Sequence, residues 1–285
     1  MLDFTYYPLS GTQYGGSERK LGIIINGNEY MLKFQKTSPL DSRFNHISEY
    51  IGSHIFEILG FDVQETCLGT YEGKNVVACK NFISASEQFV PFNEVGESTL
   101  EQDKEIYQYS YEDIMQMLRD NVKLTHVEES INLFWRIYIV DALLGNFDRH
   151  GLNWGFIKSH NKYRLAPVFD NGACLFPQMC DEDMMKKIIA SKEETEKRVL
   201  QFPTSQIKLN GQKSSYYEVI SSLRYPECNE ALEYVMNKID MAKIEKLVTH
   251  TEGISETHKE FYLHMLRSRY KLILEESYSK LKANG

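Results

Sequence analysis

Three side chains that carry oxygen follow one another in an order that suits phosphoryl transfer. Asp148 and Asn153 lie five positions apart, and Asp170 comes two positions before Gly172. Phosphoryl transfer requires a carboxylate that orients the attacking hydroxyl, and oxygen ligands that hold Mg²⁺ against the phosphates. Because Mg²⁺ prefers hard oxygens and takes few protein ligands, one Asp and one Asn suffice when ATP oxygens and water complete its shell. The pattern therefore predicts a site for ATP and Mg²⁺.

A buried helix and a short hairpin are expected to position these three residues. Apolar residues recur over 128–144 in the pattern of a helix, and two short strands are expected between 154 and 169. This order places Asp148 and Asn153 on the loop that follows the helix. The hairpin then delivers Asp170. The chain from Asp181 onward is expected to be mostly helical, with a final helix over about 255–281.

Each of these motifs also has an alternative that involves no chemistry. Asp148, Asn153 and the run from Asp170 to Gly172 are turn-forming types, because Asp and Asn bond readily to their own backbone. The order of the two loops, after this helix and separated by this hairpin, favours the catalytic interpretation. A nuclease interpretation of the Asp148-Arg149-His150 cluster would leave the upstream groups unexplained.

The first eighty residues are rich in β-type patterns and supply the complementary charge. A short aromatic strand is expected around Phe4–Tyr7. Asn26-Gly27 separates two β-prone runs at 21–25 and 29–34, which predicts a hairpin with a type I′ turn. Lys33 lies in the second run. A lysine in an apolar strand is commonly a solvent-facing edge residue, and this alternative stays open for Lys33.

Two further features accompany the lysine. Gly15, Gly16 and Ser17 form a glycine-rich turn, whose backbone N–H groups can approach phosphates closely. Glu49 lies on an amphipathic helix expected over 47–59 and is the natural ion-pair partner of Lys33. The alternative for Glu49 is a solvated carboxylate on the helix surface.

Composition excludes several classes of protein. The chain of 285 residues carries 32 Lys and Arg against 40 Asp and Glu, a formal charge of −8, which argues against non-specific nucleic-acid binding. No stretch approaches the roughly 18 apolar residues that span a bilayer, and no secretory signal is visible. Five cysteines without a C-x-x-C pair indicate reduced structural thiols. We therefore expect no nucleic-acid partner, no membrane partner and a cytoplasmic location.

Taken together, the motifs resemble those of the HipA-like serine/threonine kinases. The resemblance covers nearly the whole chain, including its C-terminal helices. It is carried by Tyr30–Phe34, Ser48–Tyr50, Val63–Tyr71, Val76–Lys80, Leu143–His150, Asn153–Phe156, Phe169–Gly172, Ile239–Met241 and His258–Phe261.

The resemblance implies an α+β, bilobal, protein-kinase-like fold. The small β-rich N-lobe would comprise residues 1–82, and the larger, mainly helical C-lobe residues 83–285. The implied activity is an ATP- and Mg²⁺-dependent serine/threonine protein kinase whose partners are ATP and a protein that carries Ser or Thr. Autophosphorylation is also implied, with Ser10, Thr12 and Ser17 as candidate acceptors.

Residue roles follow on matching positions in the second half of the chain. Asp148 would be the catalytic base, which orients or deprotonates the acceptor hydroxyl. Asn153 and Asp170 would ligate Mg²⁺. His150 would lie near the γ-phosphate, or would only order the loop.

In the first half, the resemblance implies a nucleotide-binding set. Lys33 would hold the phosphates and Glu49 would pair with it, beneath the glycine-rich turn at Gly15–Ser17. Val77, Cys79 and Lys80 would belong to the inter-lobe hinge over 77–80, whose backbone receives adenine.

Two functional alternatives and several departures from protein kinases remain. A small-molecule kinase of the antibiotic-kinase type would share the same Asp and Asn geometry, and a pseudokinase would be a binding module. The loop contains Asn-Phe-Asp148 where ordinary protein kinases have His-Arg-Asp, and no Ala-Pro-Glu follows Asp170. An antitoxin partner is not inferred. The family resemblance implies that the cytoplasm is bacterial, and it raises delivery into host cells as a second localisation.

Overall fold

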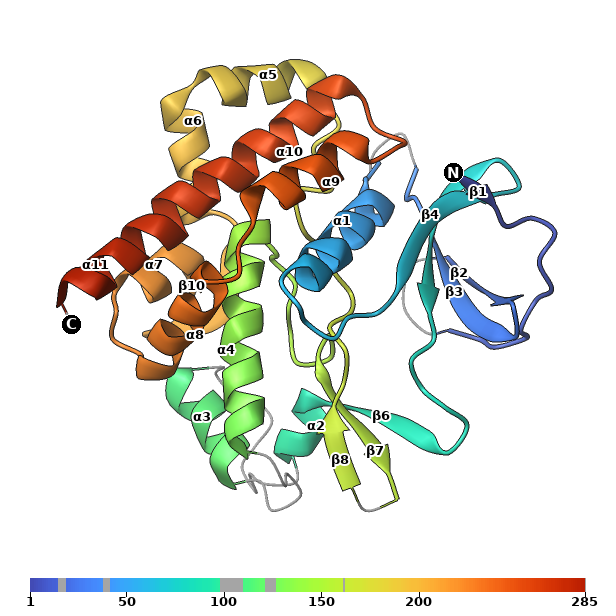
Figure 1. The fold of residues 1–285 in the computed structure, drawn as a ribbon, viewed down its shortest axis with the longest axis horizontal. Helices are drawn as coiled ribbons and strands as arrows, with labels where there is room; N and C mark the ends of the chain where they lie inside the picture. Colours follow the sequence, from blue (N-terminus) through green and yellow to red (C-terminus); the bar gives the residue numbers. More distant parts are fainter. Residues whose placement is uncertain (15–18, 38–41, 98–109, 121–126, 161, 285) are drawn as a thin grey trace. The chain divides into compact units, whose positions relative to one another are not determined.

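The structure is a computed structural model in which the chain forms two compact units (Figure 1). It describes residues 1–14, 19–37, 42–97, 110–120, 127–160 and 162–284. Unit 1 comprises Met1–Phe82, Pro167–Ala190 and Asp240–His264. Unit 2 comprises Ile83–Ala166, Ser191–Ile239 and Met265–Gly285. The division into lobes at 1–82 and 83–285 stays a prediction.

A five-stranded sheet forms the β-rich part of unit 1, in the order β1-β4-β5-β3-β2. Only β1 is parallel to its neighbour. The strands are β1 (Leu2–Asp3), β2 (Lys20–Ile25), β3 (Asn28–Phe34), β4 (Thr66–Tyr71) and β5 (Lys74–Lys80). In the β2–β3 turn, Asn26 and Gly27 have φ angles of +48° and +78°, the left-handed values that a type I′ turn requires. The predicted hairpin is confirmed.

The first strand differs from the expectation. A strand was predicted at Phe4–Tyr7, but β1 ends at Asp3 because the chain turns there, with Tyr7 N–H donating to the Phe4 carbonyl. Phe4 is buried against Gly69 of β4, where a Cβ atom would lie 2.3 Å from the Phe4 ring. Phe4 therefore packs in the hydrophobic core and is not part of the strand.

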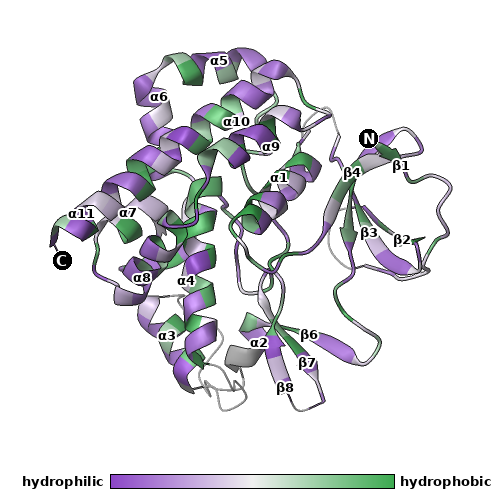
Figure 2. Cartoon of the chain, viewed as in Figure 1, coloured by the Kyte–Doolittle hydropathy of each residue, from purple (hydrophilic) through white to green (hydrophobic). Residues whose placement is uncertain are grey.

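Helix α1 (Asn45–Ile58) packs against β4 and β5. Its isoleucines Ile47, Ile51 and Ile55 are all buried, as the four-residue spacing predicted, and Gly60 follows the helix at φ +79°. Figure 2 shows hydrophobic residues recurring along α1 between hydrophilic ones. The other helices of unit 1 are α5 (Glu182–Ala190), α9 (Met241–His250) and α10 (Glu256–Arg269) up to His264.

An isolated bridge joins the segment before Asp170 to the segment before β4. Val168 N–H donates to the Asp62 carbonyl, and Gln64 N–H donates to the Val168 carbonyl. This short parallel pairing fixes the chain two residues before Asp170. Asp170 and this pairing both belong to unit 1.

In unit 2, the buried helix α4 (Val127–Leu144) packs against α3, α7, α8 and η2. The surrounding helices are α2 (Phe92–Glu97), α3 (Tyr111–Asp120), α6 (Lys192–Glu196), α7 (Tyr216–Ser221), α8 (Pro226–Met236) and α11 (Glu276–Asn284), with π-helical turns η1 (Lys197–Gln201) and η2 (Tyr270–Glu275). Two small sheets complete the unit: β6 (Glu87–Pro91), β7 (Gly155–Ser159) and β8 (Lys162–Leu165), and the hairpin of β9 (Thr204–Leu209) and β10 (Gln212–Ser215).

These elements confirm the α+β prediction and correct three details of unit 2. The hairpin expected between 154 and 169 has a third strand, β6, paired with β7. The turn at Asn210-Gly211 joins two strands within a region expected to be mostly helical. The helix expected over 255–281 contains the π-helical turn η2.

The C-terminal end of α4 is held by a buried arginine. Arg269 is 1% exposed, and it donates from Nε to the Ala142 carbonyl and from Nη1 to the Arg198 carbonyl. The last carbonyls of a helix lack partners within the helix and carry partial negative charge, so a cation stabilises this end. The loop that contains Asp148 therefore starts from a fixed point.

All five cysteines are free thiols. Within the part of the chain that the structure describes, no helix combines the length and apolar character needed to cross a membrane.

Candidate functional site

Lys33 makes two short ion pairs inside unit 1. Its Nζ lies 2.7 Å from Oε2 of Glu49 on α1 and 2.8 Å from Oδ1 of Asp170. Period-two alternation along β3 directs the Lys33 side chain to the α1 side of the sheet, and the residue is only 7% exposed. The interpretation as a solvent-facing edge lysine is therefore wrong, and so is that of Glu49 as a solvated carboxylate, since Glu49 is 1% exposed.

The two carboxylates determine the charge state of this lysine. Burial by itself would lower the pKa of the Lys33 ammonium, because a low dielectric disfavours charge. The neighbouring carboxylates of Asp170 and Glu49 outweigh burial and hold the Lys33 pKa well above its usual range. Lys33 is thus a fixed cation in unit 1.

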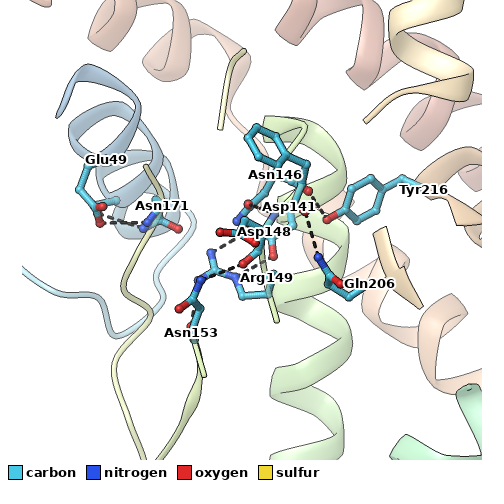
Figure 3. Close-up of polar contacts among 11 residues, drawn as sticks. Glu49, Asp141, Asn146, Asp148, Arg149, Asn153, Asn171, Gln206 and Tyr216 are labelled. Atoms are coloured by element: carbon cyan, nitrogen blue, oxygen red, sulfur yellow. Dashed lines mark hydrogen bonds and ion pairs between the residues drawn. The ribbon is translucent and has the colours of Figure 1, made fainter. Parts of the chain in front are cut away.

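Asp170 lies in a strained turn that is bonded to α1. Its φ of +58° is in the left-handed region, which Asp and Asn tolerate better than most residues. The next residue, Asn171, donates its N–H to Oε1 of Glu49 at 2.9 Å (Figure 3). Glu49 therefore binds the lysine through one oxygen and the Asp170 turn through the other.

In unit 2, Asp148 lies on the loop after α4, as predicted. Its side chain is 51% exposed, and its N–H donates to Oδ1 of Asn146 at 3.0 Å. Asn153 is buried and donates from Nδ2 to the Asp148 carbonyl at 2.8 Å. Because this bond fixes which way the Asn153 amide points, its Oδ1 is the atom left to act as an oxygen ligand.

A buried ion pair that the sequence analysis missed supports this loop. Asp141 on α4 accepts from Nε of Arg149 at 2.9 Å and from Nη2 at 3.1 Å, and Arg149 Nη1 also donates to the Asn153 carbonyl (Figure 3). Asp141 interrupts an otherwise apolar helical run, which is the signal that could have revealed it. A buried carboxylate requires a partner, and Arg149 lies on the loop that follows α4.

Hydrogen bonds of three further polar side chains hold the start of this loop, at Asn146 and Phe147. Asn146 donates to Oδ1 of Asp141 at 3.0 Å. Tyr216 donates its hydroxyl to the Asn146 carbonyl at 2.6 Å, and Gln206 donates to the Phe147 carbonyl at 3.0 Å. The β9–β10 hairpin and α7 supply these last two contacts, and no sequence motif indicated either of them.

His150 lies beside Asp148. Its Nδ1 accepts from the Leu152 N–H at 3.2 Å, so the ring proton of the neutral form is on Nε2. Nε2 lies 3.8 Å from Oδ1 of Asp148. The structure therefore places His150 next to the predicted base, and its contact with a γ-phosphate stays a prediction.

The hinge assigned to residues 77–80 requires a correction. Val77, Cys79 and Lys80 lie in β5, between β3 and β4. The backbone of residues 76–79 pairs on both sides, while Lys80 N–H and C=O bond to Glu65 and Gln64. The backbone groups of residues 76–79 are therefore used within the sheet, and contact of Val77, Cys79 and Lys80 with adenine stays a prediction. The division between the units falls later, after Phe82.

Cys79 and the glycine-rich turn complete the predicted set. Burial raises the pKa of the Cys79 thiol, which keeps it neutral and unreactive. Gly15, Gly16 and Ser17 lie outside the described residues, and their contact with phosphates stays a prediction.

Replacing Asp141 with asparagine should destabilise the protein by about 3–5 kcal/mol, because it leaves the Arg149 guanidinium buried without its counter-charge. Urea unfolding followed by circular dichroism measures this loss. Glu87→Gln is the matched control, since Glu87 pairs with Arg164 at the surface of the same unit. Equal effects of the two substitutions would show that the Asp141 pair does not hold the loop.

Comparisons with known proteins show the family to which the chain belongs. A family model described as the HipA-like C-terminal domain matches residues 12–243. The serine/threonine-protein kinase CtkA of Helicobacter pylori is 34% identical over 98% of this chain and 88% of its own length. A putative kinase of Haemophilus influenzae is 26% identical over 65% of this chain and 59% of its own length.

Solved structures show the same fold. The crystal structure of the Helicobacter pylori proinflammatory kinase CtkA has a TM-score of 0.93 at 32% identity and covers 100% of this chain and 98% of its own. HipA of Shewanella oneidensis, solved with HipB and operator DNA, has a TM-score of 0.60 at 14% identity over 95% of this chain and 67% of its own. The expected kinase-like α+β fold is therefore confirmed.

Proposed function

Because the chain belongs to the HipA-like family and is a phosphotransferase of the serine/threonine kinase class, we propose that it transfers the γ-phosphoryl group of ATP to Ser or Thr of a protein. The observation that carries this proposal is the pair of contacts from Lys33 to Glu49 and Asp170. A buried ammonium held by one helix carboxylate and one loop carboxylate is suited to binding phosphates and to orienting a metal ligand.

Asp148 is proposed to act on the acceptor hydroxyl. Its carboxylate is half exposed, so a hydroxyl can approach it, while the backbone on either side is fixed by Asn146 and Asn153. A positioned carboxylate orients the hydroxyl and accepts its proton as the new bond to phosphorus forms. The proposed role needs this fixed orientation, since little covalent chemistry is left to the protein.

Asn153 and Asp170 are proposed to supply oxygen ligands to Mg²⁺. The donor set fits this ion, because both side chains present hard oxygen atoms and the Asn153 amide is held by its nitrogen. Mg²⁺, when bound, neutralises negative charge on the phosphate oxygens. The contact between Asp170 and Lys33 holds the carboxylate in a fixed orientation beforehand.

Lys33 is proposed to bind the phosphates of ATP. Its ammonium is held in place by Glu49, so little conformational freedom is lost when an anion binds. The glycine-rich turn at Gly15–Ser17 is proposed to contact the same phosphates. Autophosphorylation at Ser10, Thr12 or Ser17 is part of the proposal.

The proposal is tested by incubating the purified protein with γ-labelled ATP and Mg²⁺, alone and with a cell lysate. We expect label on phosphoserine or phosphothreonine of a lysate protein or of the chain itself. Label on a small molecule alone would favour the antibiotic-kinase alternative. Absence of any ATP turnover, with the protein folded, would favour the pseudokinase alternative and contradict the proposal.

Asp170→Asn should raise the Mg²⁺ concentration needed for nucleotide binding and lower turnover by about 10²-fold, because an amide is a weaker ligand than a carboxylate. Asparagine tolerates the left-handed backbone of this position, so the turn should persist. Nucleotide binding at stepped Mg²⁺ concentrations measures the change. Unaltered Mg²⁺ dependence would remove Asp170 from the metal site.

A further inference from the structure

The turn that contains Asp170 is joined to α1 by the side chain of Asn171. This residue is fully buried, and its Nδ2 donates to Oγ of Ser53 on α1 at 3.0 Å. Its backbone N–H donates to Oε1 of Glu49, one helical turn earlier. Asn171 therefore bonds to α1 at two points, one through its main chain and one through its amide.

A glycine in the middle of α1 makes this close approach of the two segments possible. A Cβ atom at Gly52 would lie 2.7 Å from Cβ of Asn171 and 3.4 Å from its Cγ. Cβ atoms do not approach each other this closely, and the Cβ of Asn171 cannot swing away as the end of a long side chain does. Glycine is an unfavourable residue in a helix interior, so its presence at this contact has a physical reason.

The contact also explains how Asp170 keeps its backbone conformation. A residue other than glycine at φ +58° is held in a sparsely populated region, and it stays there only where its surroundings fix it. Asn171, the next residue, is fixed by two hydrogen bonds, one from its backbone N–H and one from its side-chain amide. The turn is thereby prevented from relaxing.

We propose that Asn171 and Gly52 are positioning residues that make α1 and the metal-binding turn move as one piece. Glu49 binds Lys33 and the Asn171 N–H at once, so a shift of α1 displaces the phosphate-binding lysine and Asp170 together. The inference rests on the proposed function, which gives Asp170 its Mg²⁺. It adds that the orientation of Asp170 is set by a side chain and a helix glycine that touch neither metal nor nucleotide.

The first test is Gly52→Ala. Alanine is the better helix former, so without the contact this substitution should raise the midpoint of thermal unfolding. We expect the midpoint to fall and the Mg²⁺ concentration for half-maximal turnover to rise about tenfold, because Mg²⁺ demands near-ideal ligand geometry and a displaced Asp170 would bind it more weakly. A purely structural defect would lower the amount of folded enzyme without changing its Mg²⁺ requirement.

The second test combines Gly52→Ala with changes at Asn171. In an Asn171→Gly background, which lacks the clashing Cβ, Gly52→Ala should raise the unfolding midpoint, a reversal of sign. In an Asn171→Ala background, which retains that Cβ, Gly52→Ala should still lower the midpoint. If Gly52→Ala behaves alike in all three backgrounds, the two residues are not coupled and the inference is wrong.

Ser53→Ala covers the case in which Gly52→Ala does not fold. It removes only the acceptor of the Asn171 amide, and we expect a smaller rise in the Mg²⁺ requirement. An unchanged requirement in this folded variant overturns the positioning role. The unfolding cycle needs no catalysis, so an inactive wild-type protein contradicts the proposed function, while the cycle still decides whether Asn171 and Gly52 are coupled.

Discussion

Asp148→Asn should lower the turnover number by about 10²- to 10⁴-fold and leave the midpoint of thermal unfolding nearly unchanged. The substitution keeps the size of the side chain and removes its capacity to accept a proton. Stability should persist, because this carboxylate is half exposed and the loop is held by the Asp141–Arg149 pair. Transfer of label from ATP, measured at equal concentrations of folded protein, checks the expectation.

The matched control for Asp148→Asn is Asp113→Asn, the same chemical change in α3 of the same unit. Asp113 accepts the Ser110 N–H near the start of its helix and has no place in the proposed chemistry. Turnover should be retained in this variant. Loss of turnover in both variants, or in neither, would show that Asp148 is not the catalytic carboxylate.

Lys33→Met should reduce both turnover and stability. Methionine has a similar length but no charge, so it leaves the buried carboxylate of Glu49 without its cation. Removing one partner of a buried ion pair costs about 3–5 kcal/mol of unfolding free energy. Loss of a group that binds the transferring phosphate costs about 10²- to 10³-fold in rate. Urea unfolding and labelled-ATP transfer measure the two effects separately.

Lys74→Met serves as the control for Lys33→Met. Lys74 is an exposed lysine at the start of β5, so it reports what the same exchange does at an exposed strand end of the same sheet. We expect little change in either measurement. Full activity in Lys33→Met would exclude the lysine from phosphate binding, whatever its effect on stability.

Local patterns predicted the elements whose causes are local. The left-handed turn at Asn26-Gly27 and the isoleucine face of α1 depend on residues close in sequence, and both are confirmed. The partnership of Lys33 with Glu49 was also predicted, although it joins a strand to a helix. In that case the signal was an acidic residue on the helix expected after the lysine strand, and the family resemblance implied the same pair.

The contacts that sequence analysis missed join residues whose partners are not evident from spacing. Asp141 is conspicuous in an apolar helix, but the sequence around it does not show that Arg149, on the loop after α4, forms an ion pair with it. Gly52 is an unfavourable residue inside a helix, and the reason for its presence, the contact with Asn171, lies far away in the sequence. The hinge was predicted at residues that lie within β5. The end of that strand depends on its pairing with β3 and β4, which the sequence does not show.

The position of Arg269 bears on how shorter versions of this protein should be designed. The family match ends at residue 243, whereas the guanidinium that holds the Ala142 carbonyl comes from residue 269. A fragment cut at the family boundary would retain Asp148 and its motif but lose the donor that fixes the end of α4. Residues beyond the conserved domain therefore belong to the minimal unit that can keep the Asp148 loop in place.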